Sequence, residues 1–234
     1  MDRIIGDQIV DEEQFELLLN IAKNEFKDGA VPAIRQWYEN DELGIIIVEG
    51  RQGWGKSVYA LLVLANIYNT WNWSELKKYI VYKPDEIKSR FKKKRKREPL
   101  LVWDDAGNWL NSKDYQKKAV KGACRYFQVA RSHWGCIMLT TVDSSNIVTD
   151  IRNMKGRYLI QVWKSEDATH LTRRIGRVYL KWKSPDKTRS GEEEIHRETF
   201  YLKDMPKDLY SKYKMYRDSF SNSTLNDLND EDDV

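Results

Sequence analysis

The chain has 234 residues, of which 41% are hydrophobic and 12% aromatic, with nine tryptophans. This composition can bury a sizeable core, and the length predicts one large domain or one domain with appendages. No apolar run approaches the ~18 residues needed to cross a bilayer, and the acidic start has no signal-peptide core. Cys124 and Cys136 are the two cysteines, which favours neither a disulfide framework nor a zinc site. We therefore expect a cytoplasmic protein without a membrane span.

The formal net charge of +4 is distributed unevenly along the chain. The segment after Phe220 contains no base, and its acids are Asp227, Asp230, Glu231, Asp232 and Asp233. The rest of the chain is therefore more basic than the total suggests, which favours binding to a polyanion.

The first part of the chain predicts a helix and the start of a buried sheet. Apolar residues recur on one face of a helix near 11–27, within an N-terminal helical segment at 1–40. The run GIIIVEG at 44–50 is typical of a strand buried on both faces, and the stretch that begins at Lys56 is typical of a buried helix. KYIVYK at 78–83 predicts a short strand.

Helices and strands continue to alternate up to residue 164. The expected elements are, in order, a very polar helix at 84–98, a strand at 99–105, a helix at 113–133 and strands at 135–143 and 156–164. Strands that alternate with helices predict an α/β fold with a parallel sheet, here a core domain at 41–165.

The pattern changes after residue 165. Aromatic-rich runs at 173–183 and 194–204 flank a polar loop and predict a long β-hairpin. An amphipathic helix opened by Pro206 follows it. We assign the hairpin and helix to a region appended to the core at 166–220, and we expect the acidic segment 221–234 to be disordered.

The segment GRQGWGKS matches the pattern G-x-x-x-x-G-K-[ST] and lies between an expected strand and an expected helix. Its glycines let a loop wrap so that backbone N–H groups face a phosphate chain, and the following helix presents its positive end. Lys56 can reach the outer phosphates, and Ser57 can ligate Mg²⁺. The predicted phosphate-binding residues are Gly50, Arg51, Gln52, Gly53, Trp54, Gly55, Lys56 and Ser57.

Two acids end the expected strand LLVWDD. Asp104 is placed to hold Mg²⁺ through water together with Ser57, and Asp105 to orient or activate the attacking water. The alternative is a helix N-cap or turn aspartate, which is common after strands. A third strand, CIMLTTVD, ends in Thr140 and Thr141, where a polar side chain can contact the γ-phosphate or the attacking water between the other two strands. We assign that role to Thr141.

Together these residues resemble the additional-strand P-loop ATPases, the group that contains the RecA-like and AAA-like motors. GRQGWGKS is similar to their Walker A motif and LLVWDD to their Walker B motif, with Thr140 or Thr141 at the sensor position. The family usually has glutamate where this chain has Asp105, although paired aspartates occur in some branches. VWDDAGNWL, RYFQVARSHWGCIMLTT and MPKDLYSKYKMYRD are also similar to small ATPases of archaeal viruses and plasmids. The resemblance implies a RecA-like core, ATP and Mg²⁺ as cofactors, and the host cytoplasm if the protein is viral.

The resemblance also implies an arginine, usually from a neighbouring subunit, that stabilises charge in the transition state. Arg152 and Arg157 lie just before the last core strand, and Arg131 ends the preceding helix. We assign the role to Arg152 and expect self-association, because a residue that acts in trans requires at least a dimer. The alternative for each arginine is an ordinary surface ion pair.

The run KSRFKKKRKRE places seven bases within nine residues, from Arg90 to Glu98. It predicts contact with the phosphate backbone of DNA without readout of sequence. The alternatives are a solvated helix face and a localisation-like signal.

The leading interpretation is an Mg²⁺-dependent ATP hydrolase that acts on DNA in packaging, translocation or replication. Two other classes of function stay open. WDDAG also satisfies the D-x-x-G of regulatory GTPases, and Asp143 lies where those proteins read guanine, although Thr141 replaces their lysine. The chain is then a nucleotide-dependent switch, either a GTPase or an ATPase that acts on a protein partner. The third class is a degenerate loop with a structural role alone.

Overall fold

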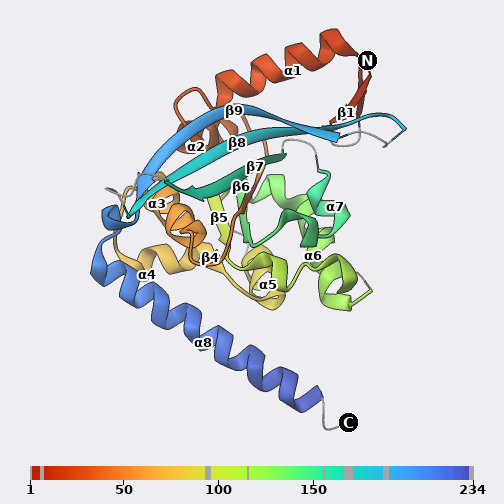
Figure 1. Ribbon diagram of the computed structural model, residues 1–234. Coiled ribbons are helices and arrows are strands. Elements are labelled where there is room, and N and C mark those ends of the chain that lie inside the picture. Colours follow the sequence, from red (N-terminus) through yellow and green to blue (C-terminus); the bar gives the residue numbers. More distant parts are fainter. Residues whose placement is uncertain are drawn as a thin grey trace.

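The computed structural model describes residues 2–5, 8–92, 96–114, 116–154, 157–165, 171–186 and 190–231. At 8, 91–92, 157, 183 and 221–231 the backbone alone is described. Within these residues the strands form one nine-stranded sheet with helices packed against it (Figure 1). The expected α/β class is therefore confirmed.

The elements alternate along most of the chain. The strands are β1 (Arg3–Ile5), β2 (Gln8–Val10), β3 (Gly44–Glu49), β4 (Ile80–Val81), β5 (Glu98–Trp103), β6 (Trp134–Thr141), β7 (Arg157–Lys164), β8 (Arg173–Lys183) and β9 (Ser190–Tyr201). The α-helices are α1 (Glu12–Glu25), α2 (Ala30–Glu39), α3 (Lys56–Tyr68), α4 (Trp73–Leu76), α5 (Pro84–Lys92), α6 (Lys118–Val129), α7 (Thr149–Arg152) and α8 (Lys207–Glu231).

The sheet has a parallel core and an antiparallel margin. Its strands lie in the order β2-β1-β8-β7-β3-β6-β5-β4, and β9 pairs with β8. The strands β7, β3, β6, β5 and β4 run parallel to one another, whereas the pairs β7–β8, β8–β9, β8–β1 and β1–β2 are antiparallel. The order places β6 between β3 and β5, so the ends of all three strands lie side by side.

Alternating side chains of β3 build two hydrophobic layers. Ile46 and Val48 pack on the face covered by α1, α2 and α3, and Ile45 and Ile47 pack on the face covered by α5, α6 and α7. All four side chains are fully buried, as expected for a parallel strand covered on both sides. Because both faces are covered, a ligand can approach this part of the sheet at the ends of its strands.

The predicted buried strands are present as β3, β5, β6 and β7, and the predicted hairpin is present as β8 and β9. The hairpin continues the sheet of the core, because β8 pairs with β7 from Leu159↔Tyr179 to Lys164↔Arg174. The N-terminal segment departs from the prediction: it contains the strands β1 and β2 and a second helix, α2. Pro32 occupies the first turn of α2, where its missing N–H costs no helical hydrogen bond.

Two helices differ in length from the sequence prediction. The sequence predicts a helix up to residue 98, whereas α5 ends at Lys92 and β5 begins at Glu98. It also predicts disorder from residue 221, whereas α8 continues to Glu231 and runs away from the sheet (Figure 1). None of the described helices, α8 included, combines the length and hydrophobicity needed to cross a membrane.

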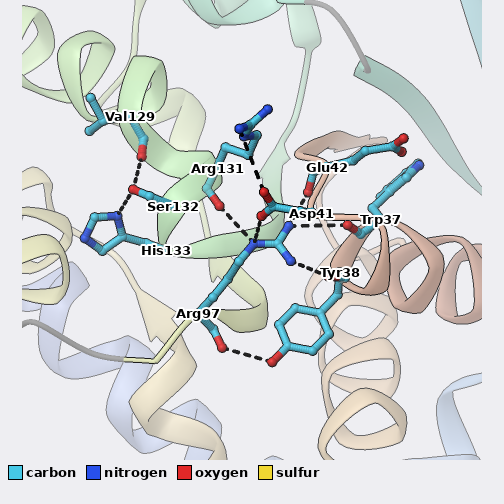
Figure 2. A network of polar contacts seen from close by, with 9 residues as sticks. All are labelled: Trp37, Tyr38, Asp41, Glu42, Arg97, Val129, Arg131, Ser132 and His133. Carbon is cyan, nitrogen blue, oxygen red and sulfur yellow. Dashed lines mark hydrogen bonds and ion pairs between the residues drawn. The ribbon is translucent and has the colours of Figure 1, made fainter.

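Arg97, directly before β5, connects the end of α2 and the turn before β6 to the amino-terminal end of β5 (Figure 2). Its Nε lies 3.4 Å from the Asp41 carboxylate, and the Tyr38 hydroxyl donates to the Arg97 carbonyl at 3.1 Å. Its guanidinium also donates to backbone carbonyls from the end of α2 to the turn before β6, at Trp37, Tyr38, Glu42 and Arg131. These contacts give Arg97 a packing role.

This packing role changes the interpretation of the basic run. The sequence predicts that the run contacts the DNA backbone, with a solvated helix face as an alternative. Two of its bases are engaged within the protein, because Arg97 donates to the backbone carbonyls described above and Arg90 donates to the Lys77 carbonyl at 3.4 Å. The side chain of Lys96 is exposed, and residues 93–95 lie outside the described residues. Lys96 and Arg97 directly precede β5, so they lie at the opposite end of that strand from Asp104.

Gly44 begins β3 directly against the ring of Trp37. A Cβ atom at this glycine would lie 2.0 Å from Trp37 Cε3. The ring has little room to move, because its centroid lies 5.7 Å from that of Phe26 and 5.5 Å from that of Tyr158. We expect Gly44→Ala to lower the free energy of unfolding by about 1–3 kcal/mol through overpacking, measured by urea denaturation.

Gly122→Ala is the matched control for this prediction. Gly122 lies inside α6, and a Cβ atom there would meet nothing within 4 Å. Alanine is the better helix former, so this variant should gain about 0.5–1 kcal/mol. Equal losses in the two variants would show that the contact with Trp37 does not limit stability.

Candidate functional site

Three glycines of the loop between β3 and α3 have positive φ angles. Gly50, Gly53 and Gly55 have φ angles of 153°, 76° and 101°, in the region that side chains rarely adopt. A Cβ atom at Gly50 would lie 2.7 Å from the Val162 carbonyl oxygen of β7. The loop leads directly into α3 at Lys56, and the first N–H groups of a helix have no partner within it.

Lys56 folds back over the glycine loop. Its Nζ donates to the carbonyl oxygens of Gly50 at 2.8 Å and Arg51 at 3.2 Å, and the residue is buried. Burial lowers the pKa of Lys56, while the charges of Asp105 and Asp104 act in the opposite direction. The ammonium group is therefore held by the loop, and Lys56 lines the same cavity as Asp105.

Asp104 joins three distant segments of the chain. Its Oδ1 accepts hydrogen bonds from Ser57 Oγ at 3.0 Å and Thr140 Oγ1 at 2.6 Å, and its Oδ2 accepts one from the Tyr213 hydroxyl at 2.5 Å. The residue is 1% exposed. Since a buried carboxylate needs polar partners, these donors determine where the ends of α3, β6 and β5 meet.

The oxygen atoms around Asp104 fit a magnesium ion. Ser57 and Asp104, the two predicted ligands, are in direct contact, so both can face one small cation. Mg²⁺ prefers oxygen ligands and is commonly held by one or two protein groups together with substrate phosphates and water. Ser57 and Asp104 would hold the ion next to the glycine loop.

Asp105 adopts a left-handed backbone conformation, with φ 52° and ψ 33°. Its N–H donates to Thr140 Oγ1 at 2.8 Å, which fixes the turn after β5. Burial and the neighbouring Asp104 charge raise the pKa of Asp105 to about 6, and the cations Arg217 and Lys56 act in the opposite direction. The carboxyl group is therefore ionised at neutral pH, and its pKa is near enough to neutrality for the group to accept a proton and return it.

The structure gives the two threonines of β6 different roles. The Thr140 hydroxyl donates a hydrogen bond to the Asp104 carboxylate and accepts one from the Asp105 backbone N–H. Thr141 Oγ1 donates to the Asp143 carbonyl at 3.0 Å and packs against Gly107, where a Cβ atom would lie 2.2 Å from it. Thr141, the residue assigned from the sequence, lines the cavity described next.

A cavity of about 560 Å³ lies at the carboxyl end of the parallel strands. Its volume falls within the roughly 300–1,000 Å³ of small-molecule sites. One wall is the glycine loop with Lys56 and Ser57, and a second includes Asp105 and Thr141. The third wall comes from the C-terminal part of the chain and contains Leu202, Tyr210, Tyr213 and Arg217.

The arginines proposed from the sequence lie apart from this cavity. Arg152 Nη1 donates to the Ser145 carbonyl at 2.8 Å, and the residue is not among those that line the cavity. Arg131 lies 3.8 Å from Asp41 beside the Arg97 contacts. The side chain of Arg157 lies outside the described part of the structure. Neither Arg131 nor Arg152 is therefore brought to the site of its own chain.

Sequence reasoning missed the support for the loop from β8. Arg174 is buried, and its Nε donates to the Trp54 carbonyl at 2.9 Å. Burial lowers the pKa of Arg174. Trp54 itself lies 5.4 Å from Trp163 between ring centroids, and Arg51 lies over its ring. The hairpin thus contributes to the position of the glycine loop.

Sequence reasoning also missed the contribution of α8. The stretch DLYSKYKMYRD predicts an amphipathic helix, but nothing local indicates which element it covers. A signal was present in the spacing of its aromatic residues, since Tyr213 and Tyr216 recur at helical intervals with Leu209 and Phe220.

Comparisons with known proteins place the chain near proteins of archaeal viruses. No family model matches it. It is 31% identical over 128 residues to the uncharacterized protein ORF286 of Acidianus two-tailed virus, covering 52% of this chain and 44% of that protein. It is 26% identical over 133 residues to the uncharacterized protein B-251 of Sulfolobus spindle-shape virus 1, covering 51% of each. The chain thus spans about half the length of the curated relatives it matches.

Among solved structures, a singly substituted form of RuvB from Thermotoga maritima matches at 17% identity and a TM-score of 0.35. The match covers 65% of this chain and 45% of RuvB. A likeness this weak adds nothing to what the chain's own residues show. The viral relatives agree with the narrower resemblance found in the sequence, and their names state no activity.

The two threonines provide a matched pair of variants. Thr140→Val removes the donor to Asp104 and the acceptor for the Asp105 N–H while keeping the side-chain shape. We expect it to lower the free energy of unfolding by about 2 kcal/mol, because the buried Asp104 carboxylate loses one of its three donors and the Asp105 N–H loses its acceptor. Thr141→Val should cost about 1 kcal/mol or less. Chemical denaturation measures both, and an equal loss would contradict the special role of Thr140.

Proposed function

We propose that this protein is an Mg²⁺-dependent P-loop ATPase that couples ATP hydrolysis to DNA packaging, translocation or replication. The observation that carries the proposal is the 3.0 Å hydrogen bond between Ser57 Oγ and Asp104 Oδ1. It joins the end of the glycine loop to the acid after β5, two sequence signals that are 47 residues apart. The position of β6 between their strands supports the proposal, because it corresponds to the additional strand of the resembled class.

The glycine loop would bind the phosphate chain. Backbone N–H groups at the start of α3 face the phosphates, and Lys56 moves its ammonium group from the Gly50 and Arg51 carbonyls to the outer phosphate oxygens. Bound Mg²⁺ would supply charge neutralisation between the phosphates. Ser57 and Asp104 would hold that ion, and Thr140 keeps the Asp104 carboxylate in place.

Asp105 would orient the attacking water. The water oxygen forms a bond to the γ-phosphorus while the bond from that phosphorus to the bridging oxygen breaks, and ADP leaves with the electron pair. Asp105 accepts the water proton and returns it to the phosphate product, so ATP and water give ADP and inorganic phosphate. A carboxyl group whose pKa is raised to about 6 is suited to both transfers at neutral pH. Thr141 would sense the γ-phosphate from the wall of the cavity.

The coupling to DNA rests on charge and resemblance. The chain outside its acidic end is basic, and the resembled motors act on nucleic acid. In this proposal the chain self-associates, so that Arg152, which lies outside its own cavity, acts in the cavity of a neighbour. A switch that acts on a protein partner is the alternative, and turnover in the presence of DNA separates the two.

The first test is steady-state hydrolysis of ATP and GTP with Mg²⁺, with and without duplex DNA at low salt. We expect ATP-selective turnover that requires Mg²⁺ and rises with DNA. Lys56→Ala should lose about 10²-fold or more, because it removes a cation from the developing charge. GTP selectivity, or turnover unchanged by DNA, would favour the nucleotide-dependent switch. Absence of nucleotide binding by the wild type would refute the ATPase altogether.

A second test addresses Asp105. Asp105→Asn keeps the size of the side chain but removes its ability to accept the water proton. We expect kcat to fall by about 10²–10⁴-fold while the affinity for a non-hydrolysable ATP analogue stays within a few-fold. Calorimetric titration measures the binding and phosphate release measures the turnover. Full activity in this variant would exclude Asp105 as the residue that activates water.

A further inference from the structure

The C-terminal helix is packed against the core through one face. Leu209 and Tyr213 are buried, and the rings of Tyr213 and Tyr216 lie 6.2 Å and 5.4 Å from that of Trp73 in edge-to-face contacts. Further along, the Phe220 ring stacks on Tyr82 at 4.9 Å. These contacts continue from the first turns of α8 to Phe220, so the helix has a defined rotation relative to the cavity.

A hydrogen bond from Tyr213 connects α8 in this orientation to the candidate site. Its hydroxyl donates to Asp104 Oδ2, the acid that would hold the metal. Arg217 follows four residues later, one turn along the same face of the helix. Its guanidinium lies 5.7 Å from the centroid of the Tyr213 ring, and the residue lines the cavity together with Lys56 and Asp105.

The electrostatic surroundings agree with this placement. The cations Arg217 and Lys56 and the acid Asp105 line the same cavity. Arg217 also pairs with Asp218 at 3.1 Å, and 31% of its side chain is exposed. The side chain is thus at the edge of the cavity, between the inner acids and solvent.

We propose that Arg217 is a catalytic residue of this site that acts in the cavity of its own chain. The inference rests on the proposed ATPase function. When a nucleotide fills the cavity, the guanidinium binds oxygens of the β- and γ-phosphates and neutralises the charge that accumulates on them as the phosphorus–oxygen bond breaks. Tyr213 is a positioning residue, because it sets the rotation of α8 through Asp104.

The other arginines near the loop have different geometry. Arg174 is buried, and its guanidinium donates to the carbonyls of Trp54, Leu171 and Arg173. Arg152 is bound to the turn after β6 and lies outside the cavity. Arg51 lies over the Trp54 ring. Among the described arginines, Arg217 is the one that lines the cavity.

The test compares Arg217→Ala, Arg217→Lys and Lys214→Ala by kcat, KM and melting temperature. Lys214 is an exposed cation on the same helix, so its variant is the matched control for loss of one positive charge. We expect Arg217→Ala to lower kcat by about 10²–10³-fold with little change in KM or melting temperature. Arg217→Lys should recover part of the rate, and Lys214→Ala should behave like the wild type. Wild-type kcat in Arg217→Ala would overturn the inference.

Mixing two inactive variants decides whether the arginine acts in its own chain. Lys56→Ala retains Arg217, and Arg217→Ala retains the glycine loop. If Arg217 serves its own cavity, every cavity in an equimolar mixture lacks one essential residue and turnover stays low. Restored turnover would overturn the assignment, because it would show that Arg217 serves a neighbour. Arg152→Ala mixed with Lys56→Ala is the contrasting pair, since restoration is expected if Arg152 acts in trans.

Failure of this inference is distinguishable from failure of the proposed function. A wild type that neither binds nor hydrolyses nucleotide refutes both. A wild type that hydrolyses ATP, with an Arg217→Ala variant that is equally active, refutes the role of Arg217 alone. A parallel fall in kcat and melting temperature that Arg217→Lys does not relieve would show that Arg217 is structural.

Discussion

The buried carboxylate of Asp104 is the interaction on which the site depends. An anion that is 1% exposed is costly unless polar partners surround it. Here the partners are hydroxyl groups of Ser57, Thr140 and Tyr213, which come from α3, β6 and α8. Because each donor belongs to a different element, satisfying one carboxylate also positions the glycine loop, the neighbouring strand and the last helix relative to one another.

The sheet brings these elements together through the order of its strands. Parallel strands have their carboxyl ends at one edge, so the residues after β3 and β5 meet the last two residues of β6 without any long loop. Those residues are the glycine loop, the pair Asp104 and Asp105, and the pair Thr140 and Thr141. The antiparallel hairpin extends the same sheet and supports the loop from the side, where Arg174 donates to the Trp54 carbonyl.

The core of the fold could be predicted because its signals are local. A run such as GIIIVEG is continuous and apolar, which is a property of a strand covered on both faces, and the structure buries Ile45 to Val48 completely. The positions of the glycine loop before α3 and of Asp104 and Asp105 after β5 could be predicted for the same reason. The helix α2 could not, because Pro32 in its sequence is typical of a helix break as well as of a first turn.

Other features could not be predicted because their partners are distant in the sequence. Arg97 is one base among several in its run, and its packing role appears only when the end of α2 and the turn before β6 are brought to it. The same limit applies to α8, whose amphipathic pattern predicts a buried face without indicating what that face covers. Tyr213 and Arg217 therefore carried no signal of their place beside the cavity.

The bond between Tyr213 and Asp104 has a consequence for how the molecule is made. It joins residues 109 positions apart. During synthesis the glycine loop, both acids and both threonines leave the ribosome well before Tyr213 does, and domains generally fold in the order of synthesis. Until Tyr213 has been synthesised, Asp104 lacks one of its three donors. A chain that stopped before α8 would contain the glycine loop, both acids and both threonines, and would still lack the Tyr213 donor to Asp104.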